Sequence, residues 1–162
     1  MLGDVDEPQR GQIALFSYPV NNSYIFVKRV IGLPGDHISY INKTLYINGK
    51  KQPKKFIKDV TQLNDFGQMI TYQAYQEDLS GVKHDILIRP DVPAVNFYNL
   101  VVPKNKYLMI GDNRDESDDS RYWGYVDESE FVGQAFLIWM SWDAHANHWY
   151  DDIRWNRIGN KI

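Results

Sequence analysis

Residues 24–31, YIFVKRVI, form the apolar run from which the fold class of this chain follows. β-Branched and aromatic side chains dominate the run, which is the composition of a β-strand. Residues 32–36, GLPGD, end the strand because glycine and proline favour turns. Residues 12–16, QIALF, form an earlier apolar run that ends at the turn cluster PVNN. We therefore expect two consecutive strands near the start of the chain.

Short β segments separated by turns continue along the sequence. Residues 38–41 and 44–47 predict a hairpin, because the two residues between them are Asn and Lys, which suit a tight turn. Residues 107–110, YLMI, predict another short strand that runs into a polar loop. Residues 131–142, FVGQAFLIWMSW, predict the last long strand region. No long stretch has a clean helical period, so β-structure dominates the prediction.

The middle of the chain gives a weaker signal. Residues 50–99 are rich in lysine at their start and then mixed, and we expect short strands and loops there. The predicted fold is therefore mostly β, with an antiparallel β-sheet core and an inserted smaller β-rich lobe. We expect residues 1–36 and 107–162 to form the core and residues 37–106 to form the lobe.

Composition excludes several classes of function. The chain has 162 residues, of which 43% are hydrophobic, so it can bury a core. Its formal net charge of −3 gives no basic footprint, and we expect no nucleic-acid partner. The absence of cysteine excludes disulfides, zinc–thiolate sites and cysteine nucleophiles. No apolar run approaches the roughly 20 residues that cross a bilayer, so we expect the chain as written to be soluble.

Lys28 is a notable residue of the first long strand. Alternation places Phe26, Lys28 and Val30 on one face of this strand, and Val27 and Arg29 on the other. A lysine between two apolar side chains loses water if that face packs, and desolvation lowers the pKa of an ammonium group. A lysine with a lowered pKa can accept a proton near neutral pH. The alternative is a lysine that extends its ammonium group from a half-buried strand into water.

The polar loop at residues 111–121, GDNRDESDDSR, is the second candidate region. Its four aspartates cannot all lie close together as anions, so we expect its two arginines to pair with some of them. The aspartates are Asp112, Asp115, Asp118 and Asp119, and the arginines are Arg114 and Arg121. The alternative is a solvated polar turn. The loop lacks the spacing of a calcium-binding EF-hand, and His145 and His148 lack a third ligand, so we expect no metal.

Three segments together resemble the conserved boxes of bacterial type I signal peptidases. Residues 27–36, VKRVIGLPGD, resemble the box that carries the catalytic lysine of this family, and residues 111–124, GDNRDESDDSRYWG, resemble a second box. Residues 10–13, RGQI, resemble a third and weaker box, in which the family usually has Asp at the position of Gln12. The boxes occur in the family's order and span almost the whole chain, apart from a loosely matched middle.

The resemblance implies a serine–lysine peptidase without a cofactor, one of the variants of activated-serine chemistry. It implies that Lys28 is the general base and that Ser117 binds and orients this lysine. It also implies that Asp119 and Arg121 form an ion pair that shapes the loop, and that Arg29 belongs to the same polar support. The strands from both ends of the sequence would then form the catalytic core.

The resemblance implies an extended peptide as substrate, with small residues one and three positions before the cut. Such a peptide can add to a strand edge and present alternate side chains to pockets. Phe26 and Val27 point to opposite faces, so each is a candidate for a different pocket, and Leu15 on the preceding strand is a third candidate. The alternative for all three residues is ordinary core packing.

The implied partners are the signal peptides of exported preproteins and the membrane surface. Members of the family act on the outer, periplasmic face of the bacterial cytoplasmic membrane. Tryptophan side chains suit the boundary between lipid and water, and we expect one or two of those near the C-terminus to touch lipid. They are Trp139, Trp142, Trp149 and Trp155, of which Trp139 is expected in the core.

The sequence departs from the family pattern at the nucleophile. The family's serine lies in a Ser-Met-x-Pro box ahead of the lysine box, whereas only Ser17 and Ser23 precede Lys28 here, and neither lies in such a box. We therefore expect this polypeptide by itself not to cleave signal peptides. The favoured explanation is a truncated chain or a wrongly assigned start of an active enzyme. The alternatives are a homologue that binds peptides without cutting them and an unrelated β-rich binding module.

Overall fold

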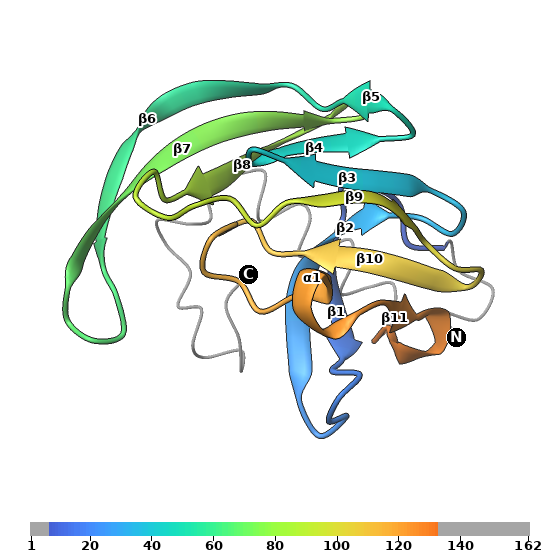
Figure 1. Cartoon of the computed structure of the whole chain (residues 1–162). Helices are drawn as coiled ribbons and strands as arrows, with labels where there is room; N and C mark the ends of the chain where they lie inside the picture. The colour runs from blue at the N-terminus through green and yellow to red at the C-terminus, as the bar shows by residue number, and fades with distance from the viewer. Residues whose placement is uncertain (1–6, 133–162) are drawn as a thin grey trace.

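The structure, a computed structural model, describes residues 7–132 and consists mainly of antiparallel β-strands in three sheets (Figure 1). The predicted mostly β class with an antiparallel core is therefore confirmed. Helical structure among these residues is limited to the single turn α1, Ser120–Trp123, and the short 3-10 helix η1, Glu128–Glu130.

The first sheet contains the strand that carries Lys28. Its strand order is β1-β2-β10-β11, so β2 lies between β1 and β10. The bounds are β1 Ile13–Ser17, β2 Ile25–Gly32, β10 Lys106–Ile110 and β11 Val126–Asp127. The predicted strands at residues 12–16, 24–31 and 107–110 are confirmed to within one residue. Two strands from the start of the sequence thus share a sheet with two from beyond residue 105, joined by the pairing of β2 with β10.

The second sheet is built around the predicted hairpin. Its strand order is β5-β4-β3-β9, with bounds β3 His37–Ile41, β4 Thr44–Ile47, β5 Lys50–Lys51 and β9 Phe97–Val101. Asn42 and Lys43 connect β3 to β4 with φ angles of 50° and 64°. Positive φ at both central residues is the requirement of a type I′ turn, whose twist matches that of paired strands. The predicted hairpin is confirmed.

The third sheet corrects the prediction of short strands and loops in the middle of the chain. It consists of three long strands, β6 Lys54–Leu63, β7 Met69–Leu79 and β8 Val82–Ile88. Most of β6 is exposed, so its sequence carries little hydrophobic periodicity, and its pairing with β7 holds it in place instead. Figure 1 shows β6 and β7 as a long curved hairpin. The division into a core and an inserted lobe stays a prediction.

β2 is buried on both faces, which explains its nearly continuous apolar sequence. Seven of its eight residues are buried. Phe26 and Val30 pack into one hydrophobic cluster with residues of β1 and β10, whereas Val27 packs into a second cluster with residues of β7 and β8. A polar side chain at such a position needs a partner, because burial removes its hydrogen bonds to water. Lys28 and Arg29 are the two polar side chains that β2 buries.

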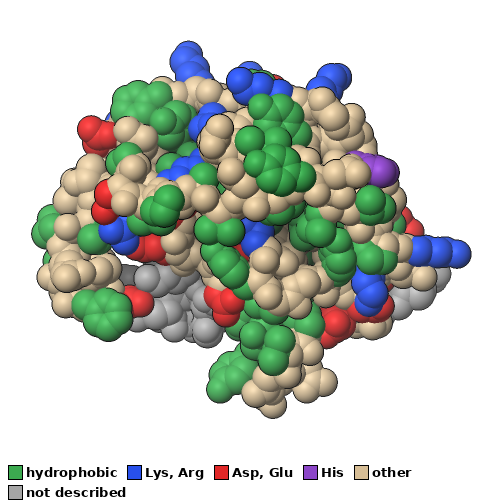
Figure 2. Space-filling view, in the orientation of Figure 1, with side chains coloured by type: hydrophobic (Ala, Val, Ile, Leu, Met, Phe, Trp, Pro, Cys, Tyr) green, Lys and Arg blue, Asp and Glu red, His purple; other side chains and the backbone are tan. Residues whose placement is uncertain are grey.

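Hydrophobic side chains also reach the surface, at the tip of the β6–β7 hairpin. Leu63, Phe66 and Met69 are exposed there, and Figure 2 shows hydrophobic groups at the corresponding lower left of the molecule. Among residues 7–132, no helix is long and apolar enough to cross a membrane. The predicted strand at residues 131–142 lies outside the described residues except for its start, where Phe131 bridges to Phe16. The four C-terminal tryptophans also lie outside them.

Candidate active site

Lys28 is fully buried in the middle of β2. Its side chain has 0% exposure, and its Nζ lies 5.8 Å from the centre of the Phe26 ring. Ala14 of β1 lies directly opposite, and its methyl group adds a small apolar neighbour. The predicted apolar surroundings are therefore present, and the alternative of an ammonium group extended into water is wrong for this residue.

The polar partner of Lys28 is Ser117, which is 89 residues away in the sequence. Lys28 Nζ lies 2.9 Å from Ser117 Oγ, and the serine is itself buried, with 6% exposure. The predicted contact is present. A hydroxyl group carries no charge, so it satisfies the amine without stabilising its protonated form as a carboxylate would.

Burial lowers the pKa of Lys28 from 10.5 to about 8. Removal from water is the largest cause, because it disfavours the charged form. The nearby carboxylates of Asp119 and Asp118 oppose the shift, while the charge of Arg121 reinforces it. About half of the Lys28 amines are therefore neutral at pH 8 and able to accept a proton.

Asp119 anchors the loop that presents Ser117. It caps α1 by accepting from the Arg121 backbone N–H, and it forms the predicted ion pair with the Arg121 guanidinium, at 2.8 Å. The same carboxylate accepts from the backbone N–H of Gly111 at 2.9 Å, at the start of the loop. Both ends of the loop therefore meet at one buried carboxylate, which fixes the position of Ser117.

Arg29, the neighbour of Lys28 on β2, binds the same loop from the opposite face of the strand. Its guanidinium binds Asp112 through two nitrogens, with Nε–Oδ1 at 2.9 Å and Nη2–Oδ2 at 2.7 Å. Both side chains are buried. This geometry is the strong, bidentate form of an arginine–carboxylate pair, so it fixes the start of the loop relative to β2.

Arg114 corrects the prediction that both arginines pair with aspartates of the loop. It pairs instead with Glu77 of β7, through Nη1–Oε2 at 2.9 Å and Nη2–Oε1 at 2.7 Å. The physical reason is the direction of the chain: Asp112 and Arg114 exchange backbone hydrogen bonds with Leu87 of β8, which places Arg114 against the third sheet. Asp112 pairs with Arg29, Asp115 with Lys43 and Asp119 with Arg121.

Glu77 and His84 are buried charged or titratable residues that the sequence analysis missed. His84 Nε2 lies 2.9 Å from Glu77 Oε1, and His84 Nδ1 lies 3.6 Å from Asp112 Oδ1. Burial would raise the pKa of Glu77, but Arg114 and the hydrogen bond from His84 hold it far below its usual range. Burial and the charge of Arg29 lower the pKa of His84. The sequence did not indicate that these residues are buried, because both lie in strands in which polar and apolar residues are mixed.

The three residues predicted to bind substrate are packed into the protein. Phe26 stacks on Tyr18 with ring centres 4.3 Å apart, and it contacts the hydrophobic cluster on the Lys28 face. Val27 points to the other face, as predicted, and Leu15 of β1 lies opposite it at the border of the second cluster. Core packing accounts for these contacts, and a role in substrate binding stays a prediction.

The two serines that precede Lys28 do not lie beside it. Ser17 pairs with Ile25, whereas Lys28 pairs with Ala14, so Ser17 is three residues further along β1. Three residues of a strand correspond to roughly 10 Å. Ser23 is exposed in the turn between β1 and β2.

The described residues contain no group of three His, Cys, Asp or Glu side chains that could hold a metal ion. Two of the loop's carboxylates are engaged by cationic side chains: Asp112 binds Arg29, and Asp115 binds Lys43 at 3.2 Å. His145 and His148 lie outside the described residues.

Comparison with known proteins gives consistent matches. Residues 2–142 match the family model described as signal peptidase, peptidase S26. A signal peptidase I from Buchnera aphidicola is 39% identical over 189 aligned positions, which cover 94% of this chain and 60% of that protein. A signal peptidase I from Pseudomonas fluorescens is 39% identical, covering 86% of this chain and 51% of that protein. This chain thus spans about half to three fifths of the length of these relatives.

A crystal structure of a signal peptidase I from Enterococcus faecalis also resembles the chain. It is 31% identical and matches with a TM-score of 0.49, covering 80% of this chain and 97% of that chain.

Proposed function

Because the chain belongs to the signal peptidase family, peptidase S26, we propose that it carries the general base of a serine endopeptidase that removes signal peptides from exported proteins. The observation that carries the proposal is the buried contact between Lys28 and Ser117, in which Nζ lies 2.9 Å from Oγ. Among residues 7–132, no carboxylate lies within hydrogen-bonding distance of the Lys28 amine. Such a buried lysine lowers the stability of the fold, but it is suited to proton transfer.

In this proposal, the neutral Lys28 amine takes the proton of a serine hydroxyl as the serine oxygen attacks the scissile carbonyl. The resulting ammonium group returns the proton to the leaving amine, and an acyl-enzyme remains. The amine then takes a proton from water, whose oxygen attacks the ester, and the ammonium group returns this proton to the departing serine oxygen. Ser117 binds the amine on one side throughout, so the lone pair of nitrogen stays directed toward the reacting hydroxyl.

The nucleophile in this proposal is the serine of the family's Ser-Met-x-Pro box. Two observations support this choice over the serines that precede Lys28. Ser17 is displaced along β1 by three residues from the position opposite Lys28, and Ser23 is exposed. We therefore propose that the 162-residue chain alone does not cleave signal peptides, and that cleavage requires this box.

The remaining residues support the base or the substrate. The Asp119–Arg121 pair and the Arg29–Asp112 pair hold the two halves of the loop that presents Ser117. We propose that an extended signal peptide binds beside β1 and β2, where Phe26, Val27 and Leu15 shape its surroundings. The reaction takes place at the outer face of the bacterial cytoplasmic membrane.

The test restores a Ser-Met-x-Pro segment from a relative at the N-terminus and measures cleavage of a precursor whose leader ends in Ala-x-Ala. Restoration produces cleavage, and Lys28→Ala lowers its rate by at least about 1,000-fold because the base is lost. Ser117→Ala lowers the rate by a smaller factor, because Ser117 only orients the base and the base itself is still present in this variant. Lys106→Ala, at a half-exposed lysine of β10, is the matched control and retains the rate.

Cleavage that survives Lys28→Ala would contradict the assignment of the base, and an equal loss in Ser117→Ala would contradict the division of roles.

A second candidate function is peptide binding without cleavage, which is favoured by the observation that neither serine that precedes Lys28 lies beside it. If the restored protein binds the precursor without cutting it, the chain is a homologue that binds extended peptides.

A further inference from the structure

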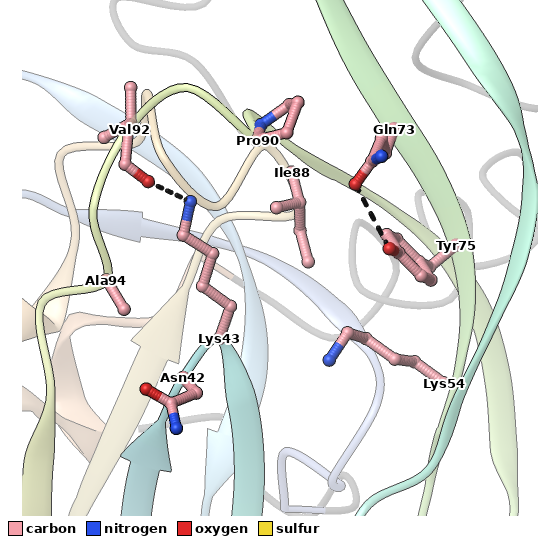
Figure 3. A pocket seen from close by; sticks show the side chains of 9 residues that line it. All are labelled: Asn42, Lys43, Lys54, Gln73, Tyr75, Ile88, Pro90, Val92 and Ala94. Atoms are coloured by element: carbon pink, nitrogen blue, oxygen red, sulfur yellow. Dashed lines mark hydrogen bonds between the residues drawn. The ribbon is translucent and has the colours of Figure 1, made fainter.

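A pocket of about 330 Å³ lies between the β3–β4 turn and the third sheet (Figure 3). Its lining comes from the β3–β4 turn, the start of β6, the middle of β7 and the segment from the end of β8 to residue 94. None of its lining residues belongs to β2, α1 or the loop at residues 111–121. Its volume is at the lower end of the range for small-molecule sites, so it suits a small ligand.

Lys54 supplies a positive charge to this pocket. Its Nζ donates to Thr44 Oγ1 at 2.7 Å and lies 5.5 Å from the centre of the Tyr75 ring. Among residues 7–132, no carboxylate lies within ion-pair distance of this ammonium group. An ammonium group has three donors, so Thr44 leaves two of them available.

The carboxylate that lies across from Lys54 is already engaged. Lys54 pairs with Glu77 in the register of β6 and β7. The Glu77 carboxylate is shared between Arg114 and His84, at 2.7 and 2.9 Å. Lys54 is therefore a partly desolvated cation, and the carboxylate opposite it on β7 forms its hydrogen bonds with Arg114 and His84 instead. The pKa of Lys54 is lowered mainly by burial.

Lys43, the other lysine of the pocket, has a different role. Its ammonium group donates to the backbone carbonyls of Arg89 and Val92 and to Asp115. These three acceptors use its three donors. Figure 3 shows the Lys43 side chain directed to Val92. Of the two lysines, Lys54 is therefore the one whose ammonium group is available to a ligand.

The rest of the lining adds amide groups and an apolar wall. Asn42 and Gln73 provide side-chain amides, and Tyr75 donates its hydroxyl to Gln73 Oε1 at 3.2 Å. Ile88, Pro90, Val92 and Ala94 provide the apolar part. A site with one cation, uncharged amide donors and an apolar wall suits a ligand that has one negative charge and a small hydrophobic body.

We propose that this pocket binds a carboxylate carried on a small apolar group, as at the C-terminus of a peptide that ends in alanine. The carboxylate accepts from Lys54, and the apolar group packs against Ile88 and Pro90. A phosphate group has more oxygens and more charge than one lysine and two amides satisfy, and arginine pairs are its better partners. This inference concerns binding at a second site and does not depend on peptidase activity.

The test titrates the whole chain with N-acetyl-alanyl-alanine and, separately, with its C-terminal amide, and follows the backbone amide NMR signals of residues 42, 54 and 73. The free acid binds with a dissociation constant of about 1 mM, as expected for a ligand of this size. The amide binds at least about tenfold more weakly, because it lacks the charge that Lys54 recognises.

Two matched variants separate the pocket from general electrostatics. Lys54→Met weakens binding of the acid about tenfold, whereas Lys51→Met, which removes the same charge from an exposed neighbour outside the pocket, leaves it unchanged. Equal binding of acid and amide overturns the proposal without any variant. An equal loss in Lys51→Met, no binding of the acid at 20-fold its expected constant (about 20 mM), or tighter binding of inorganic phosphate at the same signals also overturns it.

Discussion

Lys28 and Arg29 are neighbours on β2, both are fully buried, and they lie in opposite kinds of surroundings. Arg29 meets a carboxylate through two hydrogen bonds and belongs to a network of buried charges with Asp112, Glu77 and Arg114. Lys28 faces Phe26 and a serine hydroxyl. The first environment keeps its cation charged and fixes the loop, whereas the second favours loss of the proton.

One strand can therefore hold both a structural ion pair and a residue suited to proton transfer. Alternation along β2 turns consecutive side chains to opposite faces, so two cations that are adjacent in sequence need not share an environment. The loop at residues 111–121 contacts both of them, through Asp112 on one face and Ser117 on the other. Removal of the charge that pairs with Arg29 should therefore lower the free energy of unfolding, whereas removal of the Lys28 charge should raise it.

The largest expected effect is on the Arg29 side. Asp112→Ala leaves the Arg29 guanidinium buried without its carboxylate, which lowers the free energy of unfolding by about 3–5 kcal/mol. Urea denaturation at pH 7 measures the loss. Asp91→Ala is the control, because the Asp91 carboxylate, which pairs with Arg89, is exposed to solvent and its removal should change little. A loss for Asp112→Ala no larger than that of the control would show that the network does not stabilise the fold.

The Lys28 side should respond with the opposite sign. Lys28→Met replaces a buried amine by an apolar side chain of similar length and raises the free energy of unfolding by about 3 kcal/mol at pH 7. This figure follows from the pKa of Lys28, which is about 8 in the folded protein and 10.5 as its ordinary value. A stabilising change at a proposed catalytic residue would sharpen the contrast with Asp112.

The stabilisation by Lys28→Met should depend on pH. The unfolded protein binds more protons at this lysine than the folded protein between pH 8 and pH 10.5. The stability of the unmodified protein therefore rises with pH across this window, and the advantage of the variant falls toward zero. Denaturation curves at pH 7, 9 and 10.5 measure this trend. An advantage that is constant with pH would mean that packing, and not charge, causes it.

The smallest expected effect concerns His84, whose ring lies between the carboxylates of Glu77 and Asp112. Its pKa is lowered by burial and by Arg29, so the unfolded protein binds more protons here as the pH falls below about 6.5. Stability should therefore fall with decreasing pH below that value, and His84→Gln should reduce the slope. The exposed His37 gives the control variant, His37→Gln, which should leave the slope unchanged. Identical slopes in both variants would exclude His84 as the cause.

Local sequence predicted the parts of the fold that local physics determines. The β3–β4 hairpin follows from a two-residue turn between alternating segments, and β2 follows from a run of β-forming side chains. The contact between Lys28 and Ser117 was implied by resemblance to a family, because the residues are 89 positions apart and no periodicity connects them.

The missed features depend on pairing between distant segments. β6 is long because β7 pairs with nearly all of it, although the strand itself is mostly exposed. Arg114 was expected to pair within its own loop, since four aspartates lie within five positions of it. The choice of Glu77 instead is set by how the loop meets β8, which is a property of the folded chain.

The most direct measurement is the pKa of the Lys28 side chain, from an NMR titration of protein with ¹³C-labelled lysine ε-carbons. The Lys28 signal is identified by its loss in Lys28→Met. We predict a midpoint near pH 8 for this signal. A midpoint above pH 10 would show an ordinary ammonium group and would contradict the account of Lys28 as a buried base.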